Sequence, residues 1–180
     1  MTVDTDEVLG QIEANGYAVI PDMIDTDKLK QVRTAFSAAT ETMKQRGLVV
    51  LDPRLDPNPH NIRVNNLPDM DPVFMELLRH PDALRIARAI LGERAIVSNF
   101  SANVALPGAG SMNLHSDQAL IGPSPWNDPW LINIIWCLDD VRADNGGTLY
   151  RPESHRLRAR EEVPSDSQDR PGRFPLQQGQ

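Results

Sequence analysis

The spacing of apolar residues changes near residue 92, and this change constrains the fold more than any other feature. In the first half, Leu29, Val32, Phe36 and Met43 recur with the period of an α-helix. After residue 92 the chain becomes rich in β-branched and aromatic residues, with turn sequences between the runs. Helices followed by antiparallel strands predict an α+β fold, with a helical layer packed against one face of a sheet or jelly roll.

Caps and breakers predict where the helices begin and end. Acidic or hydroxyl residues precede each apolar run, and glycine or proline follows it. The predicted helices are residues 4–14, which Asn15–Gly16 end; residues 25–46, which Gly47 ends; and residues 72–91, which His80–Pro81 break and Gly92 stops.

Runs of β-forming residues predict the strands of the second half. The predicted strands are residues 17–20, 94–106, 114–120, 131–138 and 148–151, with turns at 107–110 and 144–147. Residues 51–69 are rich in proline, asparagine and aspartate, so we expect a long loop there, with the character of a functional lid.

Length and charge limit the class of protein. The 180 residues suffice for one core, so we treat residues 1–180 as one domain, helical to about residue 92 and β-rich from about residue 93. The net charge of −7, with no basic stripe to offset it, argues against nucleic acid as a partner. No apolar run reaches the ~18–20 residues that span a membrane. The acidic N-terminus does not resemble a signal peptide, and we expect a cytoplasmic protein.

Two smaller features bear on chemistry. The single cysteine, Cys137, cannot form an intramolecular disulfide and lies in an apolar run, so we expect a buried, inert thiol. A basic cluster follows at Arg151, Arg156, Arg158 and Arg160. A solvated loop is the plainer interpretation of this cluster, and a site for an anionic substrate or cofactor is the alternative.

His115 and Asp117 are the first candidates for a metal site. Residues two apart on a strand point to the same face, so this imidazole and carboxylate can converge on one cation. They would supply two ligands of a 2-His-1-carboxylate triad, which leaves coordination positions open. The alternative is an exposed His and Asp in a turn. The flanking Gly108, Gly110 and apolar run 131–138 favour the metal site.

Several further segments accompany this pair in a fixed order along the chain. They are Asn15-Gly-Tyr-Ala-Val-Ile-Pro21, Leu114-His-Ser-Asp-Gln118, Trp136-Cys-Leu-Asp-Asp140, Asn145-Gly-Gly-Thr148 and Arg151-Pro-Glu-Ser-His-Arg156. In this order they resemble the phytanoyl-CoA dioxygenase family. Each segment alone is a weak signal, but the set is specific and covers nearly the whole chain.

The resemblance implies a double-stranded β-helix of ~8 strands, a jelly-roll or cupin-like core with the helices packed outside. It implies Fe(II) and the co-substrate 2-oxoglutarate, with His115 and Asp117 as catalytic metal ligands. Asn113 and Thr148 match positions that contact 2-oxoglutarate; a turn residue and an ordinary strand residue are the respective alternatives. The implied reaction hydroxylates a small organic substrate with O₂ and decarboxylates 2-oxoglutarate to succinate. The resemblance leaves substrate and oligomeric state open.

The C-terminal part departs from the family pattern. The distal histidine ligand, and the arginine that pairs with 2-oxoglutarate, have no counterpart up to Gln180. Residues 174–180 resemble the lead-in to the strand that would carry them. His155 is the only histidine after the pair, but the pattern places it in the turn before the distal ligand, so a structural role is favoured over metal ligation. We expect a truncated dioxygenase; a non-catalytic relative and completion by a partner subunit are the alternatives.

Other residues carry weaker expectations. His60 and Arg63 either line the pocket or belong to a surface loop, and His80 caps a helix end. Trp126 and Trp130 either pack on an apolar substrate or anchor their loop. A competing class is a cupin-like binding module or a hydrolase with Zn²⁺, although no cysteine cluster or His-x-x-x-His motif supports zinc.

Overall fold

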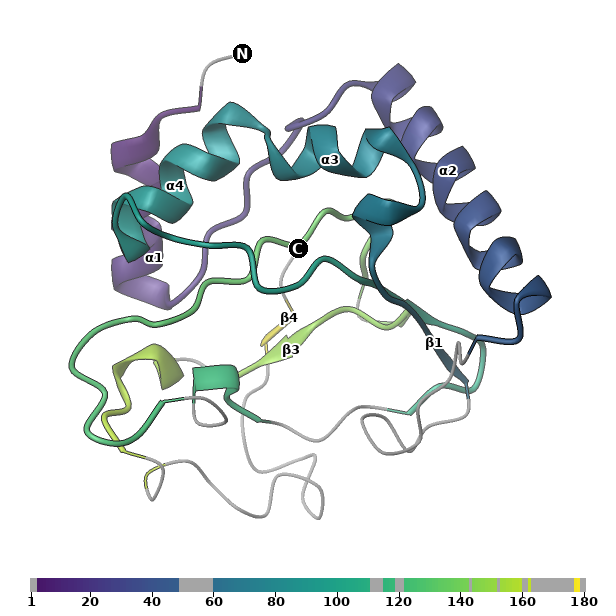
Figure 1. The fold of residues 1–180 in the computed structure, drawn as a ribbon. Helices are drawn as coiled ribbons and strands as arrows, with labels where there is room; N and C mark the ends of the chain where they lie inside the picture. Colours follow the sequence, from purple (N-terminus) through teal and green to yellow (C-terminus); the bar gives the residue numbers. More distant parts are fainter. Residues whose placement is uncertain are drawn as a thin grey trace.

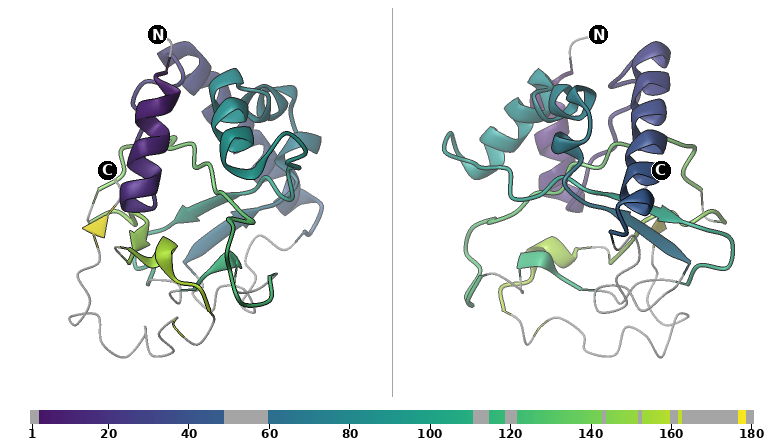
Figure 2. Two further views of the ribbon diagram at one scale, coloured as in Figure 1. Left: turned by 90° about the vertical axis from the view of Figure 1, so that its left-hand side faces the viewer. Right: turned by 45° about the vertical axis from the view of Figure 1, so that its right-hand side comes forward.

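Four α-helices lie above short antiparallel strands in the described part of the chain (Figure 1). The computed structural model describes residues 3–48, 60–110, 115–118, 122–142, 144–151, 153–159, 162 and 177–178. Helix α1 (Thr5–Asn15) packs beside α4 (Pro81–Leu91), and α2 (Thr26–Gln45) packs beside α3 (Pro72–Leu78). Two further views show the same upper layer of helices (Figure 2).

The first two helices begin and end where their local sequence predicts. The carboxylate of Asp4 accepts hydrogen bonds from the backbone N–H groups of the first turn of α1, and Gly16 ends that helix in the left-handed region at φ 84°. Asp25 caps α2 by accepting from the backbone N–H of Lys28 at 2.7 Å. Gly47, at φ 64°, follows its last turn.

The third predicted stretch is divided, as expected, at His80–Pro81. Asp71 caps α3 by accepting from the backbone N–H of Val73 at 2.9 Å, and a proline occupies the first turn of both α3 and α4. Gly92 ends α4. Proline lacks the N–H that a continuous helix would need, which accounts for the break.

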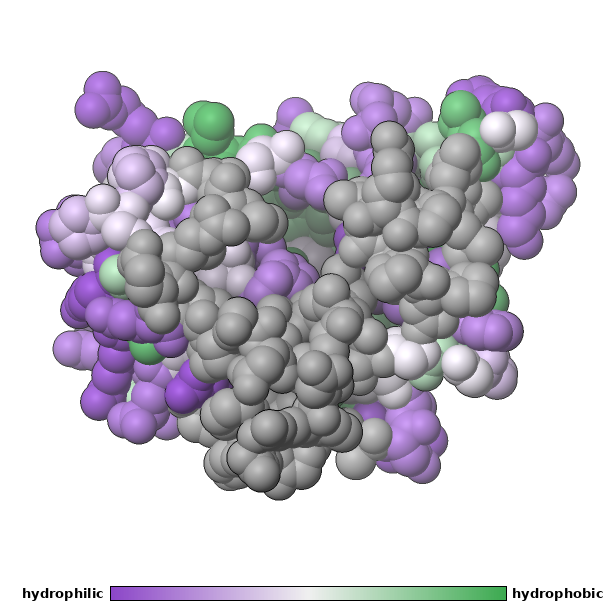
Figure 3. Space-filling model, turned by 90° about the horizontal axis from the view of Figure 1, so that it is seen from below, coloured by the Kyte–Doolittle hydropathy of each residue, from purple (hydrophilic) through white to green (hydrophobic). Residues whose placement is uncertain are grey.

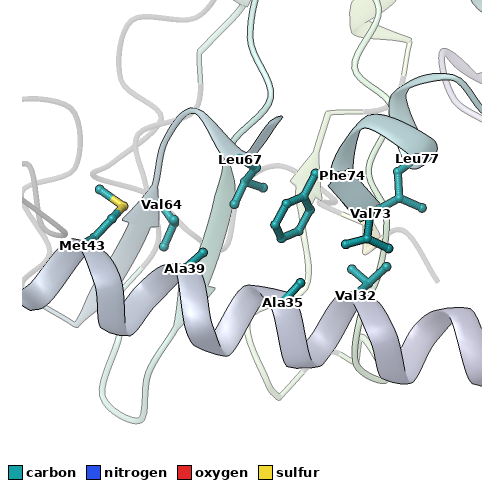
Figure 4. Close-up of a cluster of buried hydrophobic side chains, with 9 residues drawn as sticks. All are labelled: Val32, Ala35, Ala39, Met43, Val64, Leu67, Val73, Phe74 and Leu77. Carbon is teal, nitrogen blue, oxygen red and sulfur yellow. The ribbon is translucent and has the colours of Figure 1, made fainter. Parts of the chain in front are cut away.

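The main core lies between α2, β1 and α3. One stripe of α2 points toward residues from the other elements (Figure 4). The buried cluster consists of Val32, Ala35, Ala39, Met43, Val64, Leu67, Val73, Phe74 and Leu77. The helical spacing therefore predicts Val32 and Met43 correctly. Phe36 is partly buried against this cluster, and the small residues Ala35 and Ala39 allow α2 to approach closely.

Two antiparallel pairs of strands are described. Strand β1 (Asn61–Val64) pairs with β2 (Ala102–Ala105), with Asn61 opposite Ala105. Strand β3 (Leu149–Tyr150) pairs with β4 (Gln177–Gln178). Short 3₁₀ helices follow β1 and β3, namely η1 (Leu67–Asp69) and η2 (Ser154–Arg156).

The α+β prediction is confirmed, and the jelly-roll core stays a prediction. The described strands form two sheets of two strands each. The loop predicted over residues 51–69 is wrong for its second part, because β1 and η1 lie there; residues 51–59 lie outside the described residues. The predicted turn at residues 107–110 and the predicted short strand within 148–151 are both present.

Other predicted strands are wrong or shorter than expected. Residues 17–20 and 131–138 contain no strand, and only 102–105 of the 94–106 run pairs. β-forming side chains do not make a strand by themselves, because the ladder needs a backbone partner at the right distance. Residues 135–138 still alternate: Trp136 and Leu138 pack against the core.

Cys137 lies on the opposite face of this alternation. The structure places its thiol at the surface, which corrects the expectation of a buried cysteine. Burial of a strand-like run depends on whether both faces are covered, and here the outer face of residues 135 and 137 is exposed.

One face of the molecule shows the hydrophilic character of the described surface. Seen from below, most of the described side chains around the rim are hydrophilic (Figure 3). Among the described helices, none combines the length and the apolar character that crossing a membrane requires.

Candidate metal site

His115 and Asp117 approach each other, although not in the way the sequence predicts. Residues 115 and 116 have no regular structure, and residues 117 and 118 begin a helical turn, so the predicted strand at 114–120 is wrong for these described residues. Even so, Nε2 of His115 lies 3.4 Å from Oδ1 of Asp117. The two side chains therefore converge from irregular backbone and a helical residue, and not through a shared strand face.

The second oxygen of the Asp117 carboxylate has its own partner. Oδ2 accepts a hydrogen bond from Nδ2 of Asn133 at 2.8 Å. Asn133 lies 16 residues further along the chain, in the segment predicted as a strand. Sequence reasoning missed this residue, because no local pattern connects an asparagine to a carboxylate so distant in the chain.

The pair fits the donor set of a divalent cation. Two ligands bonded to one cation at about 2.0–2.2 Å lie roughly 3–3.5 Å apart, and the observed separation is 3.4 Å. The side chains of His115 and Asp117 are 45% and 41% exposed, so solvent or a ligand can reach both. In the described residues, no group of three His, Cys, Asp or Glu side chains surrounds a common point.

Gln118 connects this pair to the loop at residues 122–130. Its side-chain amide donates to the backbone carbonyl of Asp128 at 3.2 Å and accepts from the backbone N–H of Trp130 at 3.0 Å. The backbone carbonyl of Gln118 accepts a hydrogen bond from the backbone N–H of Gly122 at 2.8 Å. Residue 118 therefore holds both ends of the loop beside Asp117.

The two tryptophans of this loop have different environments. Trp126 is buried and donates its indole N–H to the carbonyl of Gly122 at 3.0 Å. Its backbone N–H bonds to the carbonyl of Arg158 at 2.7 Å. Trp130 is 50% exposed, and its ring lies against Gly122. Trp126 thus anchors the loop, which the sequence offered as one alternative, while Trp130 presents an accessible aromatic surface.

The predicted co-substrate residues are less defined. Thr148 is exposed and directly precedes β3. Asn113 lies outside the described residues. Roles for both in binding 2-oxoglutarate stay predictions.

His155 holds the turn at residues 153–156 against the end of α1. Its Nε2 lies 3.1 Å from the carbonyl oxygen of Glu13, and its ring packs on Gly16. Arg156 donates to the carbonyl oxygen of Ala14 at 3.4 Å. Basic side chains at a helix C-terminus satisfy carbonyls that have no partner inside the helix. This contact supplies the structural role that the sequence favoured for His155.

The remaining histidines differ in their surroundings: His80 is half-buried and His60 is exposed. Nε2 of His80 lies 3.1 Å from the carbonyl oxygen of Met23, and its ring lies 5.4 Å from that of Trp136. His80 therefore joins the helix break to the segment at 136, and it does not cap α4 through its side chain. His60 precedes β1, and its ring approaches Gly108 in the turn after β2.

The basic cluster is largely engaged in structural contacts. Arg156 pairs with Glu153 at 3.2 Å, and Arg158 donates to the carbonyl oxygen of Trp126 at 3.1 Å. These bonds support the interpretation of a surface loop; Arg160 lies outside the described residues.

Comparison with known proteins agrees with the motif set. The model of the phytanoyl-CoA dioxygenase (PhyH) protein family matches residues 12–178. Dioxygenase af480 of Aspergillus fumigatus is 39% identical to this chain over 169 residues. The alignment covers 94% of this chain and 55% of that protein, so the chain spans about half the length of this curated relative.

Proposed function

Because the chain belongs to the phytanoyl-CoA dioxygenase family, we propose that it carries residues of an Fe(II)- and 2-oxoglutarate-dependent dioxygenase site. The proposed reaction is hydroxylation of a small organic substrate by O₂, with decarboxylation of 2-oxoglutarate to succinate. We also propose that its strands belong to the jelly-roll core of such enzymes.

One observation carries this proposal: the donor atoms of His115 and Asp117 lie 3.4 Å apart and are open to solvent. One neutral nitrogen and one carboxylate oxygen suit Fe(II), which accepts mixed nitrogen and oxygen ligands. When bound, Fe(II) and 2-oxoglutarate would supply the activation of O₂ that no amino-acid side chain provides.

The protein's own residues would bind the metal and 2-oxoglutarate and would contact the substrate. His115 and Asp117 would hold the metal, and Asn113 and Thr148 would contact 2-oxoglutarate. Gln118 fixes the loop at residues 122–130 beside the pair. Through Trp130, this loop would offer an aromatic surface to an apolar part of the substrate.

A second candidate is a family member that binds metal without turnover. The observation that favours it is that no third His, Cys, Asp or Glu joins His115 and Asp117 within the described residues. A two-ligand site holds a cation less tightly than a complete facial triad.

Succinate formation distinguishes the two candidates. We expect the purified chain, given Fe(II), 2-oxoglutarate and O₂ without added substrate, to release succinate above the level of its Asp117→Ala variant. The His155→Ala variant is the control: its rate should match that of the wild type once the folded fraction is equal, because His155 contacts α1. Equal background rates for wild type and Asp117→Ala would contradict the catalytic proposal and favour the second candidate.

A further inference from the structure

We propose that Asn133 is a positioning residue that fixes the Asp117 carboxylate for metal binding; this inference rests on the proposed function. The Nδ2 atom of Asn133 donates to Oδ2 of Asp117 at 2.8 Å, while Oδ1 of the same carboxylate faces Nε2 of His115 at 3.4 Å. Each carboxylate oxygen thus has a different neighbour. One is held by the protein and the other points to the place where a cation would bind.

The need for such a partner follows from the freedom of aspartate. Rotation about χ2 of Asp is broad, with no strong staggered preference. The Asp117 side chain is 41% exposed, so packing alone does not hold its carboxylate. A hydrogen bond from an amide N–H to a carboxylate is charge-assisted and directional. It therefore restrains the rotation that would turn Oδ1 away from His115.

Asn133 is itself held in place by the neighbouring contacts. Gln118, next to Asp117, bonds to the backbone at Asp128 and Trp130, which fixes the chain shortly before Asn133. Three side-chain hydrogen bonds therefore join residues 117–118 to residues 128–133. This arrangement performs the alignment that a strand ladder would otherwise provide, since neither segment is described as a strand.

The orientation of the Asn133 amide is determined by chemistry. A carboxylate accepts hydrogen bonds and cannot donate them, so the amide must present its NH₂ group and not its carbonyl oxygen. Outer partners of metal-binding carboxylates and imidazoles commonly change metal affinity 10- to 100-fold when removed. Asn133 is exposed, so we expect an effect near the lower end, about tenfold.

The test is titration with Mn(II) alone, followed by electron paramagnetic resonance of the free ion. Four chains are compared with the wild type: Asn133→Ala, Asn133→Gln, Asn127→Ala and His115→Ala. Asn127 is the matched control, because it is an exposed asparagine of the neighbouring loop. We expect Kd for Mn(II) to rise about tenfold in Asn133→Ala, to stay unchanged in Asn127→Ala, and to become unmeasurable in His115→Ala.

The Gln variant separates positioning from general structure. It retains an amide donor on a longer side chain, so its Kd should lie between those of the wild type and Asn133→Ala. The visible absorption bands of bound Co(II) should shift in Asn133→Ala, because the geometry of the carboxylate ligand changes. Thermal unfolding of all variants, measured without metal, shows whether any loss of affinity is only a loss of folded protein.

The outcomes distinguish this inference from the proposed function. If His115→Ala abolishes Mn(II) binding while Asn133→Ala equals the wild type in both Kd and Co(II) spectrum, the positioning role is wrong and the metal pair stands. If His115→Ala binds Mn(II) as well as the wild type does, or if the wild type does not bind, the metal pair itself is wrong and the positioning role with it.

Discussion

The helical part before residue 92 and the segments from 115 to 159 are held together by different forces. Among the residues that the structure describes, all the buried apolar ones except Trp126 lie between Val8 and Ile86. The later segments carry several exposed apolar side chains, including Ile134 and Ile135. The described contacts of these segments include side-chain hydrogen bonds, such as the one between Asp117 and Asn133, while Trp136 and Leu138 pack against the core of the first region.

Polar and aromatic contacts also join the two regions. Arg33 of α2 donates to the carbonyl oxygen of Leu138 at 2.6 Å, and the ring of Tyr17 packs against that of Tyr150 in a tilted arrangement, with ring centroids 4.5 Å apart. His155 lies on the end of α1. Apolar burial supplies most of the free energy of folding, so the first region should dominate stability. The second region places the candidate site and should tolerate local change.

The largest expected effect tests the dominance of the helical core. Phe74 is 1% exposed, and truncation in Phe74→Ala should lower the free energy of unfolding by about 3–4 kcal/mol through lost burial and a residual cavity. Ile135→Ala, at a side chain that is 64% exposed, should change it by about 0.5 kcal/mol or less. Urea denaturation measures both variants. Similar losses in the two would contradict the division between the regions.

A smaller effect tests the joint between the regions at Gly16. This residue has φ 84°, and a Cβ there would lie 2.5 Å from Nδ1 of His155. Gly16→Ala combines backbone strain with displacement of that ring, so we expect a loss of about 2 kcal/mol in the free energy of unfolding. Gly10→Ala is the matched control within the same helix. A Cβ at Gly10 meets nothing within 4 Å, and alanine there should stabilise by about 0.5–1 kcal/mol.

Thermal unfolding of both glycine variants would decide this point. Gly16→Ala is made both in the wild-type protein and in the His155→Ala variant. If it lowers the free energy of unfolding equally in both, backbone strain alone is responsible. A larger loss in the wild-type background would show that the contact between α1 and the 153–156 turn contributes.

The smallest effect is the titration of the tyrosine contact. The hydroxyl of Tyr150 donates to that of Tyr17 at 2.8 Å, and this hydrogen bond, helped by partial burial, raises the pKa of Tyr150 to about 12. Ionisation of Tyr150 removes the donated proton. The contribution of this hydrogen bond to the stability of the folded protein is therefore complete below pH of about 10, the usual tyrosine pKa, and is lost as pH rises toward 12.

Ultraviolet absorbance of tyrosinate measures this titration directly. The chain has 2 tyrosines, so the Tyr17→Phe variant leaves Tyr150 as the only titrating phenol. Its pKa should fall toward 10 in that variant, because the acceptor is gone. A Tyr150 that titrates near 10 in the wild-type protein would show that the two regions are not joined at this contact.

The candidate site was only partly predictable from the sequence. The motif identified His115 and Asp117 as partners, and their donor atoms are close, but the strand that was expected to align them is absent at residues 115–118. Asn133 was missed because its role depends on a contact between distant segments. The sequence could not tell which of Trp126 and Trp130 anchors the loop and which is accessible to a substrate. Both are tryptophans of the same loop, and only their tertiary surroundings distinguish the buried one from the exposed one.

The sequence by itself determined the helices and their ends. Asp4, Asp25 and Asp71 cap helices through hydrogen bonds to residues two or three positions away, and Gly16 and Gly92 end them. Such interactions are local, so the sequence contains both partners in a short window. Tertiary structure alone decided whether the β-forming run at 131–138 became a strand and which face of it is exposed. A strand, unlike a helix, takes its hydrogen-bond partners from elsewhere in the chain.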